Sequence, residues 1–360
     1  MALKVGVLGC GNISGAYFDN ALRMPAIDIV ACADRHLDRA QETGEKYGIL
    51  GSSVDELLAG DVDIVLNLTT PDAHFEVAKT AILAGKHVYN EKPLTISLEE
   101  GRELLKLAES HGVRVGCAPD TFLGAGYQTV RKLIDEGSIG TPVSFAAFML
   151  CPGHESWHPN PFFYYDFGGG PMFDMGPYYL TALVHLFGPV RRVCGTTSKA
   201  MDERLITSQP HSGERAPVKV PTHVQCLLEM ESGVVGTLIT SFDVQAHTLP
   251  NIQVYGTEGS LNCPDPNTFG GPILRGKGSE WEDVPLAFAN ETNSRSLGVA
   301  DMAAAIESGR EHRASGALAG HVLEVMHAAH DSAATGQYIE LSSGVQPAAM
   351  PLGLGEGEVD

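Results

Sequence analysis

The chain has 360 residues, of which 43% are hydrophobic and 19% charged, a composition typical of a globular protein large enough for two packed units. Its 24 basic and 44 acidic residues give a net charge of -20, which argues against nucleic acid and anionic membranes as partners. The sequence has no apolar stretch of the roughly 18 residues that a membrane span needs, and it opens on a strand pattern rather than a signal peptide. We therefore expect a cytoplasmic protein.

The seven cysteines are scattered along the chain, and no two of them form a C-x-x-C pair. Several lie inside apolar, strand-like runs, where a free cysteine behaves as a small hydrophobic residue. We expect reduced thiols in the core. Because no cluster of histidines and carboxylates has the spacing of metal ligands, we also expect no metal site.

Residues 1 to about 120 alternate short apolar runs with helical patterns, which is typical of a parallel α/β sheet covered by helices. The predicted strands are Lys4–Gly9, Ile27–Ala33, Ile64–Leu68, His87–Asn90 and Arg114–Cys117. The predicted helices are Ser14–Met24, Leu37–Tyr47, His74–Ala84 and Leu98–His111.

After residue 120 most strand patterns follow one another without long helices between them, as in a mostly antiparallel sheet. The strands are predicted at Val143–Leu150, Val190–Ser198, Thr222–Met230, Val234–Asp243 and Asn251–Tyr255. The helices are predicted at Gln128–Glu136, Pro177–Phe187, Val299–Ser308 and Leu318–Thr335. The polar segment 202–221 is expected to be an exposed loop. Residues 121–341 are predicted to form an α+β substrate-binding and oligomerisation domain, and residues 342–360 a tail that follows the surface or frays.

A glycine-rich turn, Gly9-Cys10-Gly11-Asn12-Ile13-Ser14, joins the first predicted strand to the first helix. A strand, a glycine turn and a helix N-terminus form a phosphate cradle in which backbone N–H groups can hold a dinucleotide. Ser14 replaces the third glycine of the G-x-G-x-x-G pattern and is small enough to preserve close helix–strand packing. Four residues of this turn are taken as cofactor-binding: Gly9, Gly11, Asn12 and Ile13.

Asp34 ends the second predicted strand, where a carboxylate can accept hydrogen bonds from both hydroxyls of an adenosine ribose. A 2′-phosphate would meet a like charge there, so Asp34 favours NAD as the cofactor. The neighbouring Arg35 can pair with a 2′-phosphate, which leaves NADP open as the alternative.

Two further strand ends carry polar residues that should face the same ligand, because ligands bind outside the carboxyl ends of parallel strands. One is the tip Asn67–Asp72, in which Thr70 or Asp72 can equally serve as a simple helix cap. The other is Glu91-Lys92-Pro93, which brings a lysine to the reacting centre. Six residues of these tips are taken as cofactor-binding: Thr69, Thr70, Pro71, His74, Glu91 and Lys92.

A resemblance to a known family rests on Gly9-x-Gly11, Thr70-Pro71-x-x-His74, the segment 84–88, Glu91-Lys92-Pro93 and the glycine-rich run 168–176. In these motifs the chain resembles the glucose–fructose oxidoreductase/inositol dehydrogenase (Gfo/Idh/MocA) family. The resemblance covers nearly the whole chain. It implies an N-terminal Rossmann domain and a C-terminal domain with a large, mostly antiparallel sheet. It also implies an NAD(P)-dependent oxidoreductase that acts on a secondary hydroxyl of a sugar, glycoside or cyclitol.

The resemblance gives roles to matching positions only. Lys92 matches the family's catalytic lysine, Glu91 lies near the nicotinamide ribose, and Asp174 matches a substrate-binding or catalytic aspartate. Four residues after that aspartate the family commonly carries a histidine acid/base, where this chain has Tyr178. Thr181 stands where the family frequently has a further aspartate.

The residues leave three candidates for the base that removes the substrate's hydroxyl proton. A tyrosine has an ordinary pKa of about 10, which the Lys92 ammonium would lower at Tyr178. Alternatively Lys92 is itself the base and Tyr178 lines the pocket. The third candidate is His158, because an imidazole titrates in the useful range, although loop histidines such as His158 and His154 are more often surface or capping residues.

The catalytic set is therefore predicted to be Lys92, Asp174 and Tyr178. Substrate contacts are also expected from Asp120, at the start of the second domain, and from the aromatic cluster that begins at Trp157, since aromatic faces pack against sugar rings. The predicted substrate-binding residues are Asp120, Trp157, His158, Asp174 and Tyr178.

These features predict an NAD(P)-dependent sugar or polyol dehydrogenase. Two alternatives stay open: an enzyme that retains NAD and cleaves or epimerises a glycoside through a keto sugar, and a non-catalytic nucleotide-binding sensor. Lys92 and Asp174 argue against the sensor. Because an open, partly apolar sheet face is normally covered, we expect a homodimer or homotetramer.

Overall fold

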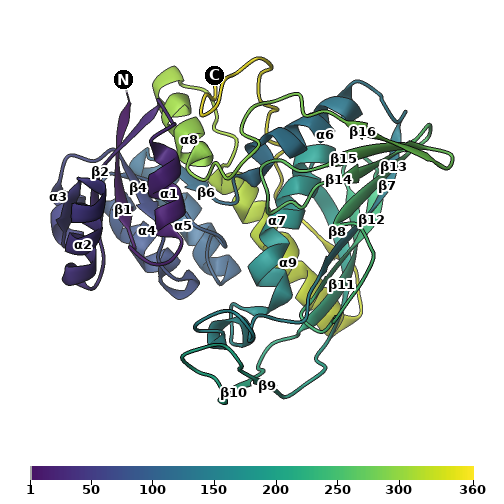
Figure 1. The fold of residues 1–360 in the computed structure, drawn as a ribbon, viewed down its shortest axis with the longest axis horizontal. Coiled ribbons are helices and arrows are strands. Elements are labelled where there is room, and N and C mark those ends of the chain that lie inside the picture. Colours follow the sequence, from purple (N-terminus) through teal and green to yellow (C-terminus); the bar gives the residue numbers. More distant parts are fainter. Residues whose placement is uncertain (1) are drawn as a thin grey trace.

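The alternating strands and helices at the start of the chain form a six-stranded sheet in the order β3-β2-β1-β4-β5-β6, parallel throughout (Figure 1). The structure is a computed structural model and describes residues 2–360. The strands are β1 (Leu3–Leu8), β2 (Ile27–Ala33), β3 (Leu50–Ser52), β4 (Ile64–Asn67), β5 (His87–Asn90) and β6 (Val115–Cys117). The helices are α1 (Ser14–Ala21), α2 (Leu37–Tyr47), α3 (Val54–Ala59), α4 (His74–Leu83) and α5 (Leu98–His111). This is the Rossmann arrangement that the sequence predicted, with β3 and α3 added.

Local signals explain where these helices begin and end. Ser97 caps α5 by accepting a hydrogen bond from the backbone N–H of Glu100, whose side chain completes a capping box. Gly112 ends the same helix in the left-handed conformation, at φ 67°. The segment β3–α3 was missed because β3 has only three residues and its first, Leu50, is exposed.

The second half of the chain forms a nine-stranded sheet in the order β16-β15-β14-β13-β7-β12-β11-β8-β17. Its strands are β7 (Pro142–Leu150), β8 (Val190–Ser198), β11 (His223–Met230), β12 (Val235–Ser241), β13 (Ile252–Gly256), β14 (Ser260–Cys263), β15 (Ile273–Lys277), β16 (Glu280–Val284) and β17 (Ile339–Glu340). Only the β7–β12 pair is parallel, so the mostly antiparallel sheet is confirmed.

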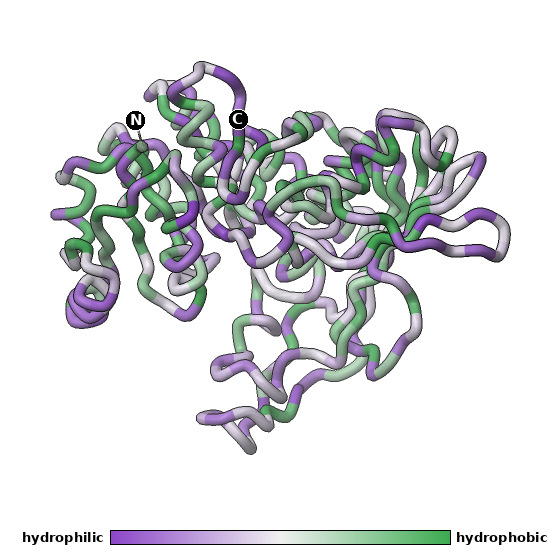
Figure 2. Tube along the Cα trace, turned by 45° about the horizontal axis from the view of Figure 1, so that its top comes forward, coloured by the Kyte–Doolittle hydropathy of each residue, from purple (hydrophilic) through white to green (hydrophobic). Residues whose placement is uncertain are grey.

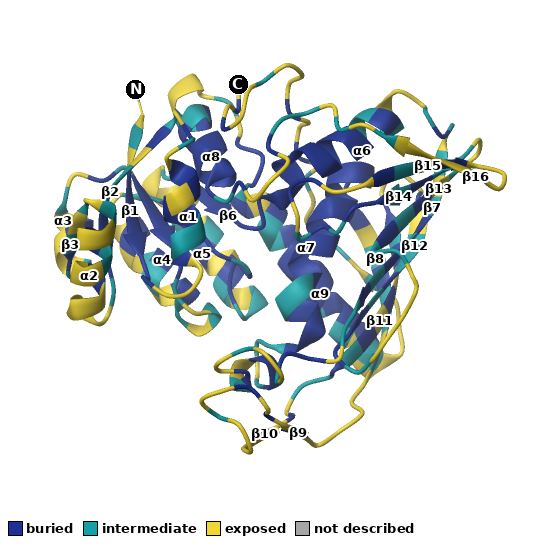
Figure 3. Cartoon of the chain, in the orientation of Figure 1, coloured by how far each residue is buried: buried dark blue, intermediate teal, exposed yellow. Residues whose placement is uncertain are grey.

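Helices cover one face of this large sheet and leave the other bare (Figure 1). The helices of this half are α6 (Ala125–Asp135), α7 (Gly170–Phe187), α8 (Leu297–Ser308) and α9 (Gly316–Thr335). Along β7 the side chains of Phe145, Ala147 and Met149 are buried under them, while alternate residues point to the bare face. Figure 3 shows α7 almost wholly buried, and Figure 2 shows hydrophobic segments gathered inside both halves and hydrophilic ones along the outer loops.

Three predictions need correction. Helix α7 begins at Gly170 rather than Pro177, because the glycine-rich run itself opens the helix and Pro177 lies inside it. Segment 202–221 contains a small hairpin, β9 (Glu203–Leu205) and β10 (Arg215–Pro217), in which Arg204 and Ala216 are buried. Strands β14, β15 and β16 were missed because they are short and separated by glycines, prolines and charges.

The C-terminal tail follows the surface and does not fray. Met350 and Val359 are buried, and the backbone N–H of Gly357 donates to Asn290 at 2.9 Å. Helix α8 packs against β2 and β6, so a late part of the chain completes the first half of the molecule. The domain limits at residues 120 and 341 remain predictions. Within residues 2–360 no helix is long and apolar enough to cross a membrane.

Candidate active site

The glycine turn after β1 has the form of a phosphate cradle. Gly9 has φ 101°, and a Cβ there would lie 2.8 Å from the Leu68 carbonyl group, so only glycine fits. A Cβ on Gly11 would meet no atom within 4 Å, which leaves open space in front of the turn. Ile13 precedes α1 and gives it no side-chain cap, and the N–H groups of Ser14 and Ala16 bond to the carbonyl groups of Gly11 and Ile13 within the turn. These features fit a dinucleotide pyrophosphate.

Asp34 holds this turn in place. Its carboxylate accepts hydrogen bonds from the backbone N–H groups of Cys10 and His36, both at 3.0 Å. The guanidinium of Arg39 lies 3.7 Å from the same carboxylate, whereas Arg35 is exposed and contacts His36. Sequence reasoning named Arg35 as the cation near a 2′-phosphate and missed Arg39, which reaches Asp34 from the first turn of α2.

The ends of β4 and β5 are joined by a buried amide pair that the sequence did not reveal. Asn67 Nδ2 donates to Asn90 Oδ1 at 3.0 Å, and Thr69 Oγ1 donates to Asn67 Oδ1 at 2.6 Å. Thr69 is half-buried and Thr70 exposed, so this tip is available to a ligand. The pair fixes the distance between the Thr69 tip and the Lys92 tip.

His74 supports these two tips from below. Its ring is fully buried, with Nδ1 2.7 Å from the Pro93 carbonyl oxygen and Nε2 3.0 Å from the Thr69 carbonyl oxygen. Burial lowers the pKa of His74, although the contacts with these two carbonyl groups oppose the shift. His74 thus joins the two loops, and its direct contact with a cofactor stays a prediction.

Lys92 meets Asp174 where β5 ends and α7 begins. The ammonium donates to Asp174 Oδ1 at 2.9 Å and to the Asp174 carbonyl at 2.5 Å. Burial alone would raise the pKa of Asp174, but the Lys92 ammonium and a hydrogen bond from His154 outweigh it and lower that pKa to about 2. Burial likewise opposes the charge on Lys92, yet Asp174, Tyr178 and Glu91 raise its pKa. The pair is a salt bridge at neutral pH.

Glu91 is held beside Lys92 by both of its carboxylate oxygens. Tyr17, on α1, donates to Oε1 at 2.7 Å, and the backbone N–H of Lys92 donates to Oε2 at 2.8 Å. Tyr17 therefore links the helix after the glycine turn to the lysine tip. Sequence reasoning did not single it out.

A histidine reaches the other oxygen of Asp174. Nε2 of His154, in the loop after β7, lies 3.1 Å from Asp174 Oδ2. An ionised carboxylate only accepts hydrogen bonds, so Nε2 carries the proton in this contact. His158, the histidine that the sequence favoured, lies four residues further on and accepts a hydrogen bond from the Asn160 N–H. Trp157 is 61% exposed and stands at the rim.

Tyr178 lies between two cations. The Lys92 ammonium is 5.3 Å from the centre of its ring, and the Arg295 guanidinium is close enough to act on its pKa. Burial raises the pKa of Tyr178, and Lys92 and Arg295 reduce that effect without cancelling it. The expected lowering by Lys92 is therefore present but is outweighed by burial. Arg295, in the segment before α8, was not found from the sequence.

Asp120 is held against the start of α8. It is 1% exposed and accepts a hydrogen bond from the backbone N–H of Gly298, in the first turn of α8, at 2.9 Å. Burial raises its pKa to about 6, although that bond and Arg295 oppose the rise. Asp120 thus anchors α8, and its contact with a substrate stays a prediction.

Both halves of the chain match models of one oxidoreductase family. Residues 3–118 match "Oxidoreductase family, NAD-binding Rossmann fold", and residues 127–262 match the "GFO/IDH/MocA C-terminal domain". The chain belongs to the GFO/IDH/MocA family.

Relatives and solved structures agree with this membership. A 1,5-anhydro-D-fructose reductase of Ensifer adhaerens is 30% identical over 351 residues, which cover 94% of this chain and 99% of the relative. An inositol 2-dehydrogenase of Saccharopolyspora erythraea is 27% identical over 342 residues, covering 91% of this chain and 94% of the relative. An NAD-binding oxidoreductase of Klebsiella pneumoniae has the same fold, with a TM-score of 0.82 and 21% identity over 95% of this chain and 100% of that one. A levoglucosan dehydrogenase solved with NADH and L-sorbose also has this fold, with a TM-score of 0.80 and 21% identity over 95% of this chain and 99% of that one.

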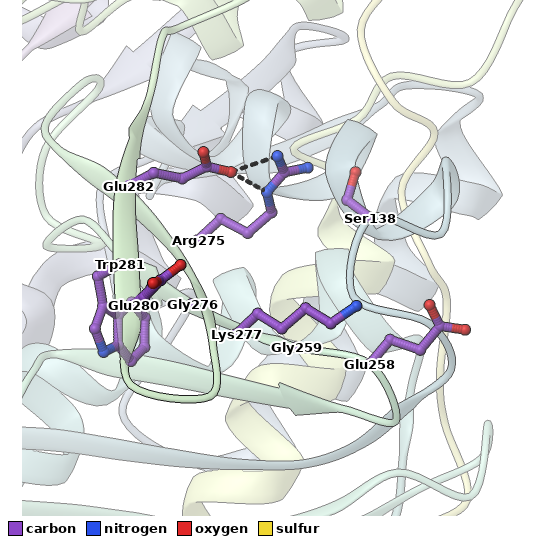
Figure 4. Close-up of a pocket in the computed structure, with 9 residues that line it drawn as sticks. All are labelled: Ser138, Glu258, Gly259, Arg275, Gly276, Lys277, Glu280, Trp281 and Glu282. Atoms are coloured by element: carbon purple, nitrogen blue, oxygen red, sulfur yellow. Dashed lines mark hydrogen bonds and ion pairs between the residues drawn. The ribbon is translucent and has the colours of Figure 1, made fainter.

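The site of this GFO/IDH/MocA member is distinct from the hollow at the hairpin ends of its large sheet. That hollow, of about 640 Å³, is lined by residues such as Trp281 and the ion pair Arg275–Glu282 (Figure 4). It shares no residue with the Lys92 cluster. Within residues 2–360 no group of three histidines, cysteines or carboxylates is arranged to hold a metal ion.

Proposed function

We propose that this protein is an NAD-dependent oxidoreductase that transfers hydride between a secondary hydroxyl of a sugar or cyclitol and the nicotinamide. The observation that carries the proposal is the Lys92–Asp174 salt bridge at the carboxyl end of β5. It lies between the glycine turn on one side and the aromatic loop after β7 on the other. When bound, a nicotinamide would supply the hydride acceptor or donor at this place.

The chain's own residues act on the substrate oxygen. Lys92 uses two of its three N–H groups on Asp174, which leaves one to donate to the oxygen of the reacting carbon. A lysine that remains charged stabilises negative charge developing on that oxygen, and it is a poor base. Asp174 fixes the lysine, and the hydroxyl proton therefore needs another acceptor.

The names of relatives support this substrate class. Besides the reductase and the inositol dehydrogenase, a D-xylose dehydrogenase of Paenarthrobacter nicotinovorans is 26% identical over 307 residues. The three names refer to an anhydrosugar, a cyclitol and a pentose. The rim aromatics Trp157 and Phe163, exposed by 61% and 43%, suit the C–H faces of such rings.

The test is absorbance at 340 nm with NAD and, separately, NADP across D-glucose, D-xylose, myo-inositol, methyl glucosides and gluconate. We expect a substrate-dependent rise with at least one of them, faster with NAD because the Asp34 carboxylate repels a 2′-phosphate. Turnover of a glycoside without any rise would replace the proposal with a redox cycle on retained NAD. Bound nucleotide without turnover of any compound would favour a sensor.

The bare face of the large sheet supports a homo-oligomer. Phe148 and Ile239 lie on it opposite each other across paired strands, partly exposed. The exposed Leu227 lies on the neighbouring strand, two residues from the partner of Ile239. A second copy would remove this apolar area from water. We expect a dimer or tetramer by light scattering at micromolar concentration, and a monomer would refute this part of the proposal.

A further inference from the structure

We infer that His154, in the loop after β7, is the acid/base that exchanges the hydroxyl proton with the substrate. The inference rests on the proposed function and names the group that the Lys92–Asp174 pair leaves undefined. Its basis is the position of the ring, which is buried against Asp174, on the oxygen that Lys92 does not occupy.

The contact with Asp174 decides which nitrogen is free. Because Nε2 donates to the carboxylate, the neutral ring keeps its lone pair on Nδ1. Within residues 2–360 no hydrogen-bond partner reaches Nδ1. Nδ1 is also not one of the unpaired polar atoms that the protein buries completely, so it stays accessible. A carboxylate that orients one imidazole nitrogen and leaves the other open is the arrangement used to activate hydroxyl groups.

The ring is fixed by packing. Its centre lies 4.3 Å from that of Tyr164, 4.7 Å from that of Phe242 and 5.3 Å from that of Trp157. The titratable groups facing this region are Asp174 from α7, Lys92 behind it, Tyr164 from the turn 162–165 and His158 from the same loop. Asp174 is the one that hydrogen-bonds to the ring, so it orients His154.

Arg204 holds the loop that carries His154. Its guanidinium donates to Oε1 of Glu155, the residue after His154, at 2.9 Å. It also donates to the carbonyl of Pro152, two residues before His154, at 3.1 Å. It also pairs with Asp243, at the end of β12, and Tyr165 donates to the second oxygen of Glu155. Arg204 is thus a positioning residue, since it acts on the reaction through the loop.

The proposed proton step balances with hydride transfer. In oxidation the substrate O–H proton moves to Nδ1 of His154, the C–H bond breaks with both electrons passing to NAD⁺ as hydride, and a carbonyl forms. Asp174 stabilises the resulting imidazolium, which then releases its proton to water. In reduction the same steps run backwards. Tyr178, whose pKa is raised, is left as a hydrogen-bond donor to the substrate.

The test compares His154→Gln with His158→Gln, a change of the same residue type four positions along the same loop. We expect His154→Gln to lower kcat/KM about 10²–10³-fold, because general acid–base catalysis contributes a factor of this size. The pH profile of kcat/KM should also lose its acidic limb in this variant. His158→Gln should keep the limb. Unchanged NADH fluorescence on binding would show that both variants are folded.

Loss of the acidic limb in His158→Gln or Tyr178→Phe, with the limb intact in His154→Gln, would overturn the inference. A second readout needs no turnover: the tautomer of the His154 ring by nitrogen NMR, with its signals identified by their absence in His154→Gln. We expect the proton on Nε2 to be favoured more strongly in the wild type than in Asp174→Ala, because the variant lacks the carboxylate that accepts this proton. Equal tautomer ratios in the two proteins would contradict the pairing even if no substrate is found. A wild-type enzyme that turns over nothing while the ratios differ would refute the proposed function and leave the pairing intact.

Discussion

The cofactor side and the substrate side of the site are built in different ways. On the cofactor side the ligand surface is mostly backbone: a glycine turn, a helix start without a side-chain cap, and the tips of β4 and β5. Asp34 and Asn67 serve mainly to hold that backbone. On the substrate side the surface is made of side chains. Asp174 and His154 come from α7 and from the loop after β7, and they meet only because the second half folds around α7. Arg295, in the segment before α8, acts on Tyr178 of the same helix.

This difference shows where function can vary within the fold. A backbone cradle depends on a few glycines and on strand order, so it tolerates changes of surrounding side chains. A side-chain cluster can lose one member and gain another from a distant segment. Tyr178 in place of a histidine, with His154 reaching the same carboxylate from another loop, is a change of that kind.

Lys92 stands where the two sides meet, so its loss should have the largest effect. We expect Lys92→Ala to lower kcat about a thousandfold, because the substrate oxygen loses its cation. NADH affinity by fluorescence should stay within about threefold, since the cradle is backbone. Lys106→Ala, an exposed lysine on α5, is the control for the loss of a charge. Turnover that survives in Lys92→Ala would remove the lysine from the reaction.

Arg204 tests how far the substrate side depends on one buried network. Arg204→Met leaves the partly buried carboxylates of Glu155 and Asp243 without their cation, and we expect the free energy of unfolding to fall by about 3 kcal/mol, the lower end of the range for a buried pair. Arg215→Met, in the facing strand of the same hairpin, removes only an exposed contact to Glu203 and should change it by less than about 1 kcal/mol. Urea unfolding measures both. Equal effects would mean that the loop is held by other contacts.

The salt bridge of Asp174 predicts an acid-sensitive contribution to stability. Its folded-state pKa of about 2 lies below the ordinary value of 3.8, so the contribution is complete above about pH 4 and is lost as the pH falls through 2. The shift corresponds to about 2 kcal/mol. Urea unfolding at a series of pH values measures this contribution. Between pH 5 and 2 the free energy of unfolding should fall by about 2 kcal/mol more in the wild type than in Asp174→Asn. Parallel pH dependences would argue that the carboxylate is not paired.

On the cofactor side the expected effects are smaller. Asp34→Asn keeps an acceptor for the Cys10 N–H but loses the charge, and we expect KM for NAD to rise about tenfold while KM for NADP rises less or falls. Asp38→Asn, on the exposed first turn of α2, should change neither. A larger loss with NADP than with NAD would mean that Asp34 does not discriminate between them.

The same division explains what the sequence could predict. The strands that end in Asp34 and Lys92, and the turn at Gly9, carry their signals within a few residues, so the Rossmann half was predicted almost strand for strand. His154 and His158 lie in one loop and look alike in sequence, and only the folded position of Asp174 separates them. Arg295 has no local motif, and His74 matched one but proved to be buried. Contacts of that kind depend on packing between distant segments, which periodicity does not encode.

The central claim is that hydride passes between the two sides at Lys92. The most direct measurement is a single turnover at 340 nm with NAD and a sugar or inositol of the panel that carries deuterium on its ring carbons. The account predicts a slower rise than with the protiated compound and deuterium in the released NADH by mass spectrometry. Released NADH without deuterium, or deuterium that returns to the sugar with no rise at 340 nm, would contradict it.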